Sequence, residues 1–202
     1  MISALHIRSL ALQRGERILF RNLSFSVTAG EAVALTGANG AGKTSLLRAV
    51  AGFIAPLAGQ IDFEAAGLDA EEARRGHTHL IGHLDGLKTA RSARDQLMFQ
   101  SRWTGGDTAA ALDAAARLGI DRLLDLEVRT LSSGQKRRLA LARLLAAPRR
   151  LWLLDEPMAP LDSAGRQLFG DMLAEHLAGG GLVLAAVHDP LPIAARHIEV
   201  AA

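Results

Sequence analysis

The chain has 202 residues, of which 49% are hydrophobic and 22% charged, with a formal net charge of +2 at pH 7. This composition excludes a disordered chain and fits one domain with a sizeable core and room for a small inserted subdomain. The absence of cysteine excludes disulfides and thiol metal sites, and the nearly balanced charge gives no reason to infer a nucleic-acid partner.

The first third of the chain is predicted to be mostly strands. A helix is expected at Thr44–Ala51, because its apolar residues share one face. Alternating or continuous apolar residues predict strands at Ala4–Leu12, Ile18–Phe20, Leu23–Val27, Ala32–Thr36 and Gln60–Phe63.

The middle of the chain is rich in Ala, Leu and Arg at helical spacing. Helices are expected at Ser92–Trp103 and Thr108–Leu118, with the tip of a core strand at Leu80–Ile81. This pattern predicts a helical subdomain at roughly residues 71–146, inserted into a single domain of residues 1–202.

The last third alternates helices with buried strands, which predicts an α/β fold with a largely parallel sheet. Helices are expected at Ser132–Ala146 and Ala164–Leu177, and strands at Leu151–Leu154 and Leu182–Val187. The apolar run Leu182–Val187 is far shorter than the ~20 residues of a membrane-spanning helix. We therefore expect a soluble or peripheral protein.

A glycine-rich loop between a predicted strand and a predicted helix fits the phosphate-binding pattern G-x-x-x-x-G-K-[ST]. Its glycines allow backbone N–H groups to surround phosphate oxygens, and the next helix presents its positive end to the same anion. Lys43 is expected to reach the β- and γ-phosphates, and Thr44 to bind Mg²⁺. A glycine-rich turn without a ligand is the alternative. The loop consists of Gly37, Ala38, Asn39, Gly40, Ala41, Gly42, Lys43 and Thr44.

Polar residues follow two buried strands, where ligands bind in open α/β sheets. Asp155 is placed to hold Mg²⁺, and Glu156 to orient or deprotonate an attacking water. His188 follows the strand at Leu182–Val187 and is placed to donate to a γ-phosphate oxygen. The alternatives are a solvated turn for the two acids and a structural role for the histidine.

The segment Leu131–Gln135 begins a predicted helix, so Ser132, Gly134 and nearby N–H groups form a potential anion site. Lys136, Arg137 and Arg138 then lie in the first turn, where cations oppose the helix dipole. We expect an anion brought by a second chain to offset them. A helix cap followed by a solvated basic face is the alternative.

Taken together, the motifs resemble those of ABC-type ATPases along nearly the whole chain. The matching segments are Gly37–Thr44 (Walker A), Leu131–Gln135 (signature), Leu151–Glu156 (Walker B), Ala159–Asp162 (D-loop) and His188 (switch histidine). The resemblance implies a P-loop fold with a mostly parallel core sheet, an antiparallel β subdomain and an inserted helical subdomain. It implies ATP and Mg²⁺ as ligands, with Ser45 also at the nucleotide.

The family also implies a head-to-tail homodimer that encloses two ATP molecules. Ser132, Gly134 and Gln135 would face the γ-phosphate bound by the other copy, and Asp162 would couple the two sites. Integral membrane permeases would convert this motion. The chain would then lie peripherally at the cytoplasmic face of the bacterial inner membrane.

Three positions depart from the family pattern. Ser133 replaces a glycine of the signature, and an aromatic residue for adenine is missing where Gln13 or Arg14 stands. Leu84 occupies the place of the Q-loop glutamine, which puts ordinary coupling to a membrane partner in doubt.

One segment narrows the resemblance. Ile81–Lys88 is similar to a Gly-His-x-x-x-x-Lys segment in the ATP-binding subunits of haem exporters for cytochrome c maturation, and Leu19–Phe25 also resembles theirs. This implies that ATP powers haem export or release of a haem-loaded chaperone. Haem ligation by His77, His79 and His83 is not expected, since they are predicted to be surface histidines.

Other classes remain open. The chain could be the ATPase of another ABC transporter, or a soluble mechanical ABC protein, although that class usually has two cassettes or a coiled-coil insert. A small P-loop kinase or GTPase would leave Leu131–Gln135 unexplained.

Overall fold

The computed structural model describes residues 1–201 and forms two compact units. The first contains Met1–Leu80, Arg149–Glu156 and the described residues from Met172 onward. The second contains Ile81–Pro148 and Pro157–Asp171.

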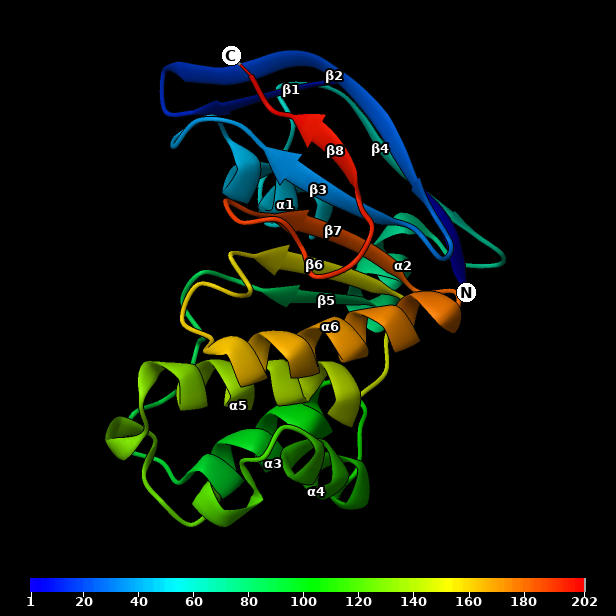
Figure 1. Ribbon diagram of the computed structural model, residues 1–202. Coiled ribbons are helices and arrows are strands. Elements are labelled where there is room, and N and C mark those ends of the chain that lie inside the picture. Colours follow the sequence, from blue (N-terminus) through cyan, green and yellow to red (C-terminus); the bar gives the residue numbers. More distant parts are fainter. Residues whose placement is uncertain (202) are drawn as a thin grey trace. The chain divides into compact units, whose positions relative to one another are not determined.

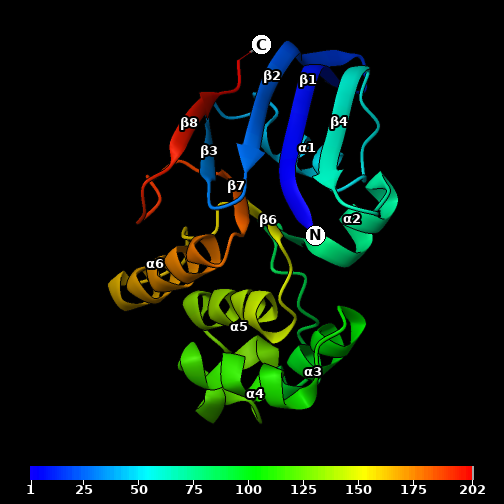
Figure 2. The same cartoon turned by 90° about the vertical axis from the view of Figure 1, so that its right-hand side faces the viewer.

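An antiparallel sheet in the first unit has the order β2-β1-β4 (Figure 2). Its strands are β1 (Ile2–Arg14), β2 (Arg17–Thr28) and β4 (Ala58–Ala65). The two short strands predicted between residues 18 and 27 are in fact the single strand β2. Asn22, with a φ of 55°, lies in an irregularity of the pairing, and asparagine tolerates this left-handed conformation.

A second sheet has five strands in the order β5-β6-β7-β3-β8 (Figure 1). They are β5 (Thr78–Ile81), β6 (Leu151–Asp155), β7 (Leu182–Ala186), β3 (Ala32–Thr36) and β8 (Arg196–Glu199). The β6–β7, β7–β3 and β3–β8 pairs are parallel, which confirms the predicted parallel core beside an antiparallel sheet. The sequence did not predict β8, a mostly exposed strand with only one apolar residue.

The core of the first unit lies among α1 (Lys43–Val50) and both sheets. Leu46, Leu47 and Val50 are all buried, as their shared helical face predicted. Every residue of β6 and β7 is buried, in keeping with interior strands of a covered parallel sheet.

The helix α2 (Ala70–His77) also belongs to the first unit. It begins with a capping box, in which Asp69 accepts from the N–H of Glu72 and the Glu72 carboxylate accepts from the N–H of Asp69. Arg74 donates to the carbonyl of Val50 and lies over the Phe63 ring. This short helix was not predicted, although Asp-x-x-Glu in the sequence is a helix start signal.

The second unit contains α3 (Ala93–Trp103), α4 (Thr108–Arg117) and α5 (Ser133–Ala146). These helices confirm the three predicted in this region, and side chains of Ser92, Asp107 and Ser132 cap their N-termini. The helix α6 (Ser163–Ala178) begins in this unit and ends in the first. Across the described chain, no helix is both long and apolar enough to cross a membrane.

His176, near the end of α6, stacks on Trp152 of β6 with 3.7 Å between ring centroids. Burial lowers the pKa of His176 from 6.5 to about 4. The unfolded chain therefore binds this proton more readily than the folded chain. The stability contributed by neutral His176 is complete above pH 6.5 and is lost as the pH falls toward about 4.

We expect His176→Phe to weaken the acid dependence of the free energy of unfolding, because phenylalanine keeps the ring packing but cannot titrate. Urea unfolding measured between pH 7 and pH 4 should show a shallower slope, by about one proton. The exposed His197 provides the control, since His197→Phe should keep the original slope. An unchanged slope in His176→Phe would contradict the prediction.

Candidate functional site

The carboxyl ends of three neighbouring parallel strands bring the predicted site residues of the first unit to one edge. Asp155 of β6 pairs with Ala186 of β7, which pairs with Leu35 of β3. The glycine-rich loop after β3, Glu156 after β6 and His188 after β7 therefore all follow strands that end at the same edge of the sheet. This is the edge where open α/β sheets bind ligands.

The glycine-rich loop has a backbone that only glycine adopts readily. Gly37, Gly40 and Gly42 have φ values of 126°, 78° and 110°. A Cβ on Gly37 would stand 2.4 Å from the carbonyl oxygen of Val200. The loop therefore requires glycine there both for its conformation and for space.

The N-terminus of α1 follows this loop directly. Gly42 is its N-cap residue, and no side chain in the described part of the chain caps it. The Lys43 side chain is buried beside the loop, where its ammonium donates to the carbonyls of Gly37 at 2.6 Å and Ala38 at 3.2 Å. The loop, the helix end and the cation together make a site suited to a phosphate group.

Thr44 and Asp155 lie in direct contact although 111 positions separate them in the chain. The Thr44 hydroxyl donates to Oδ1 of the buried Asp155 at 3.0 Å. These two hard oxygen donors suit Mg²⁺, which commonly takes its other ligands from phosphates and water. Residues 1–201 contain no cluster of three or more His, Cys, Asp or Glu residues able to hold a metal by themselves.

Glu156 and His188 form the next pair along this edge. Oε1 of Glu156 lies 3.4 Å from Nε2 of His188, and the Glu156 side chain is 20% exposed against 55% for His188. The backbone of Glu156 has a φ of 48°, a left-handed conformation that costs a residue with a Cβ roughly 1–3 kcal/mol. Its N–H donates to the carbonyl of Ala186. Such strain typically marks a functional position.

The signature segment lies in the second unit, at the start of α5. Oγ of Ser132 accepts from the N–H of Gln135, whose side-chain oxygen accepts from the N–H of Ser132. A Cβ on Gly134 would stand 3.0 Å from the carbonyl oxygen of Pro160. The side chains of Ser132 and Gln135 thus cap the helix, which agrees with the alternative of a helix cap. Ser132 is nevertheless exposed.

Asp162 occupies the position before the first residue of α6. Its Oδ1 accepts from the N–H of Gly165 at 2.8 Å, so it caps this helix. The carboxylate has a local structural role, and the predicted role between two copies of the chain stays a prediction.

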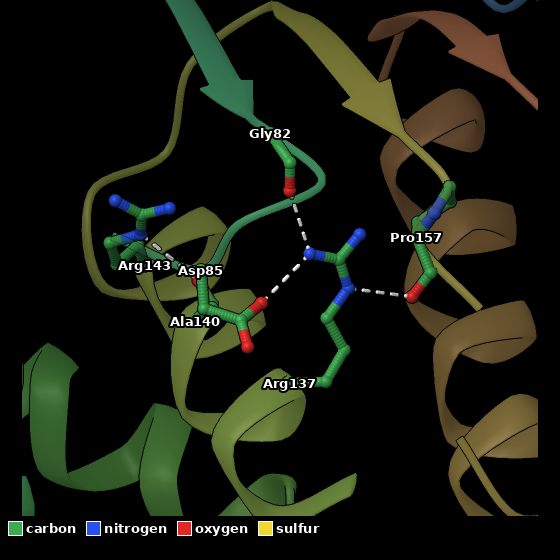
Figure 3. Close-up of polar contacts among 6 residues, drawn as sticks. All are labelled: Gly82, Asp85, Arg137, Ala140, Arg143 and Pro157. Carbon is green, nitrogen blue, oxygen red and sulfur yellow. Dashed lines mark hydrogen bonds and ion pairs between the residues drawn. The ribbon is translucent and has the colours of Figure 1, made fainter. Parts of the chain in front are cut away.

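We predicted that an anion from another chain offsets the basic residues in the first turn of α5. For Arg137 this prediction is wrong. Its side chain is 1% exposed and pairs with Asp85 of the same chain at 2.8 Å (Figure 3). This pair was not predictable from the local sequence, because a cation in a Lys-Arg-Arg run usually faces solvent.

The prediction of surface histidines is also wrong for one residue. His79 is only 5% exposed, because it lies in β5, whereas His83 is exposed as expected. Leu84, at the expected place of the family glutamine, is 83% exposed. Gln13 and Arg14 are exposed at the end of β1.

Comparison with protein families gives a match to the ABC transporter model over residues 20–159. A cytochrome c biogenesis ATP-binding export protein, CcmA, of Rhodopseudomonas palustris strain BisB5 is 45% identical, with 96% of each chain covered. The CcmA protein of Nitrobacter hamburgensis is 47% identical, with 93% of each covered.

Solved structures share the fold at lower sequence identity. One from Pyrococcus furiosus, assigned as an ABC transporter ATP-binding protein, has a TM-score of 0.84 at 22% identity, with 98% of each chain covered. A dimeric ATP-binding cassette in a post-hydrolysis state with ADP and Pi has a TM-score of 0.76 at 23% identity. This match covers 92% of the present chain and 88% of the other.

Proposed function

The chain belongs to the ABC transporter family, and within it to the cytochrome c biogenesis ATP-binding export proteins, and from this premise we propose how its residues use ATP. It is an ATPase subunit of an ABC export system that serves cytochrome c biogenesis. The contact between Thr44 and Asp155 carries the proposal, because it joins the phosphate loop to the acid after β6.

We assign the nucleotide to the loop from Gly37 to Ser45. Lys43 exchanges its loop carbonyls for β- and γ-phosphate oxygens, which a mobile ammonium can do. Thr44 and Asp155 would hold Mg²⁺, whose charge offsets that of the phosphates when it is bound.

Glu156 orients the attacking water and accepts its proton, and the 3.4 Å approach of His188 supports this assignment. The imidazole fixes the carboxylate and is exposed enough to donate to a γ-phosphate oxygen. Two groups at one strand edge thus divide the work of water activation and charge stabilisation.

A second copy of the chain completes each site in this proposal. Ser132, Gly134 and Gln135 at the start of α5 offer a helix N-terminus to the γ-phosphate held by the partner copy. Asp162 lies at the start of α6 and couples the two nucleotide sites. The dimeric cassette with a TM-score of 0.76 supports this arrangement.

The membrane partner is a permease pair of the cytochrome c maturation type, which would place the chain at the cytoplasmic face of the bacterial inner membrane. The transported or released species is haem or a haem-loaded chaperone. One exposed surface of the second unit suits such a partner. On α3, Phe99 and Trp103 stack with 6.3 Å between ring centroids and are 50% and 80% exposed.

These aromatics border a groove of about 610 Å³ that also contains Met98, three arginines (Arg91, Arg94 and Arg102) and Asp95. Exposed aromatic patches of this kind mark protein-binding sites. The surplus of arginine favours a partner segment with apolar and acidic side chains.

Co-expression with the cytochrome c maturation permeases tests the function. The purified complex should hydrolyse ATP, and a host lacking its own ATP-binding subunit should regain mature c-type cytochromes. If the complex forms and hydrolyses ATP while cytochrome c maturation is not restored, the ABC assignment stands and the biogenesis role fails.

We expect Trp103→Ala to reduce co-purification of the permease by at least about tenfold, because exposed aromatic anchors dominate interface energies. Binding of ATP by the isolated chain should stay unchanged. The exposed Leu112 of α4 provides the matched control, and Leu112→Ala should co-purify normally. Full co-purification of Trp103→Ala would exclude this surface.

We also expect the isolated chain to hydrolyse ATP slowly and the permease to stimulate it by at least about fivefold, a typical coupling effect. The isolated chain should be slow because Leu84 cannot supply the polar contacts of the family glutamine. Steady-state assays with and without the permease measure the ratio. Robust turnover by the isolated chain would count against the prediction.

A further inference from the structure

Arg137 joins three segments of the second unit through one buried guanidinium. Its Nε donates to the carbonyl of Pro157 at 2.9 Å. Its Nη1 donates to the carbonyl of Gly82 at 2.9 Å and to Oδ1 of Asp85 at 2.8 Å. Figure 3 shows these acceptors around the planar head group, each from a different part of the chain or loop.

Each of these segments leads to a group in the proposed ATPase cycle. Gly82 and Asp85 flank the exposed Leu84 in the loop after β5. Pro157 directly follows Glu156 in the chain and begins the segment that ends at Asp162. Arg137 itself lies in the first turns of α5, the helix that begins with the signature residues.

The Asp85 carboxylate also lies near a second cation, the half-buried Arg143. Burial lowers the pKa of Arg143 to about 10, and Asp85 opposes this shift whereas Arg137 adds to it. The Asp85 carboxylate therefore faces two arginines on one helix, α5. Removing Asp85 would leave the buried Arg137 with an uncompensated charge, so this pair fixes the loop against α5.

We propose that Arg137 is a positioning residue that makes the Gly82–Asp85 loop, the signature end of α5 and the segment after Glu156 move as one body. Movement of the loop carries Asp85 with it, and the rigid guanidinium passes that movement to α5 and to Pro157. This inference rests on the proposed function, in which α5 approaches a nucleotide bound by a second copy. In this chain the Arg137–Asp85 ion pair couples the loop to α5, a role that Leu84, at the position of the family glutamine, cannot perform.

The first test is Asp85→Asn in a Glu156→Gln background, which slows hydrolysis so that dimerisation can be measured. We expect the chain concentration for half-maximal ATP-dependent dimerisation, measured by analytical ultracentrifugation, to rise about tenfold. Affinity of the monomer for a fluorescent ATP analogue should change by less than about twofold, and the melting temperature by a few degrees. A purely structural role would instead lower stability and affinity together.

The second test restores Glu156 and measures stimulation by the permease. At chain concentrations that saturate dimerisation, Asp85→Asn and Arg137→Lys should both keep basal ATPase activity and lose most of the stimulation. Asparagine removes the charge that pairs with Arg137, and lysine keeps the charge but cannot bond three acceptors from a planar fork. The control Asp125→Asn breaks the exposed pair with Arg94 in the same unit, and should behave like the unaltered chain.

The outcomes separate this inference from the function on which it rests. Failure of the Glu156→Gln chain to dimerise with ATP would overturn the proposed function. Normal dimerisation and normal stimulation in both Arg137→Lys and Asp85→Asn would overturn only the positioning role. If both variants melt far below the unaltered chain, Arg137 is a residue of the fold alone, and the inference is wrong.

Discussion

Glu156→Gln is expected to lower the rate of ATP hydrolysis by about 10²–10⁴-fold while ATP binding stays intact. Glutamine has nearly the same shape as glutamate but cannot accept the proton of an attacking water. The site would therefore hold ATP without cleaving it. Two copies of the chain should then accumulate as an ATP-bound dimer.

The geometry around Glu156 supports this expectation. The residue keeps a strained backbone with a φ of 48°, and its carboxylate lies 3.4 Å from His188. Because strain of this kind persists only where the surroundings enforce it, glutamine should be held in the same place.

Size-exclusion chromatography with Mg-ATP measures the dimer, and a phosphate-release assay measures hydrolysis. Glu71→Gln makes the same change at an exposed position of α2, so it should hydrolyse ATP normally and give no trapped dimer. A Glu156→Gln chain that stays monomeric with Mg-ATP would contradict the proposal that two copies of the chain enclose two nucleotides.

Lys43→Ala is expected to lower ATP hydrolysis by at least about 10²–10³-fold, the usual effect of removing one donor to developing charge. The Lys43 side chain is buried beside the loop, and its ammonium lies within hydrogen-bonding distance of two loop carbonyls. Alanine leaves the loop and the helix N-terminus in place but removes this charge. Weaker ATP binding should accompany the slower reaction.

Arg48→Ala provides the matched control, because it removes an exposed cation from the last turn of the same helix. Its ATP affinity, measured by isothermal titration calorimetry, and its rate should match those of the unaltered chain. Retained activity in Lys43→Ala would mean that the phosphate site is assigned to the wrong loop.

Residues close in sequence were the most predictable. The helix at α3 follows from Ser92 as a cap and from apolar spacing, and β6 from a short apolar run. The phosphate loop was equally clear, because glycine spacing, the flanking strand and the next helix are all local features. The family resemblance came from the order of such local motifs, and the relatives confirm it.

Features that depend on pairing between distant residues were predicted less well. One continuous β2 replaced two predicted strands because its partner β1 runs along its whole length and absorbs the irregularity at Asn22. The edge strand β8 has little apolar pattern of its own, and its hydrogen bonds to β3 define it. His79 is buried because of its place in a sheet, which its neighbours in sequence do not reveal.

The sequence by itself determined which chemistry to expect of this protein, because the residue types and spacings of a phosphate loop, a signature segment and a strand ending in two acids are local. Only the tertiary structure decided which of these groups meet. Thr44 reaches Asp155 across 111 positions, and Arg137 finds Asp85 across 52. The physical reason is that burial and charge compensation depend on how distant segments pack, so a cation predicted to await a partner's anion is already neutralised within its own chain.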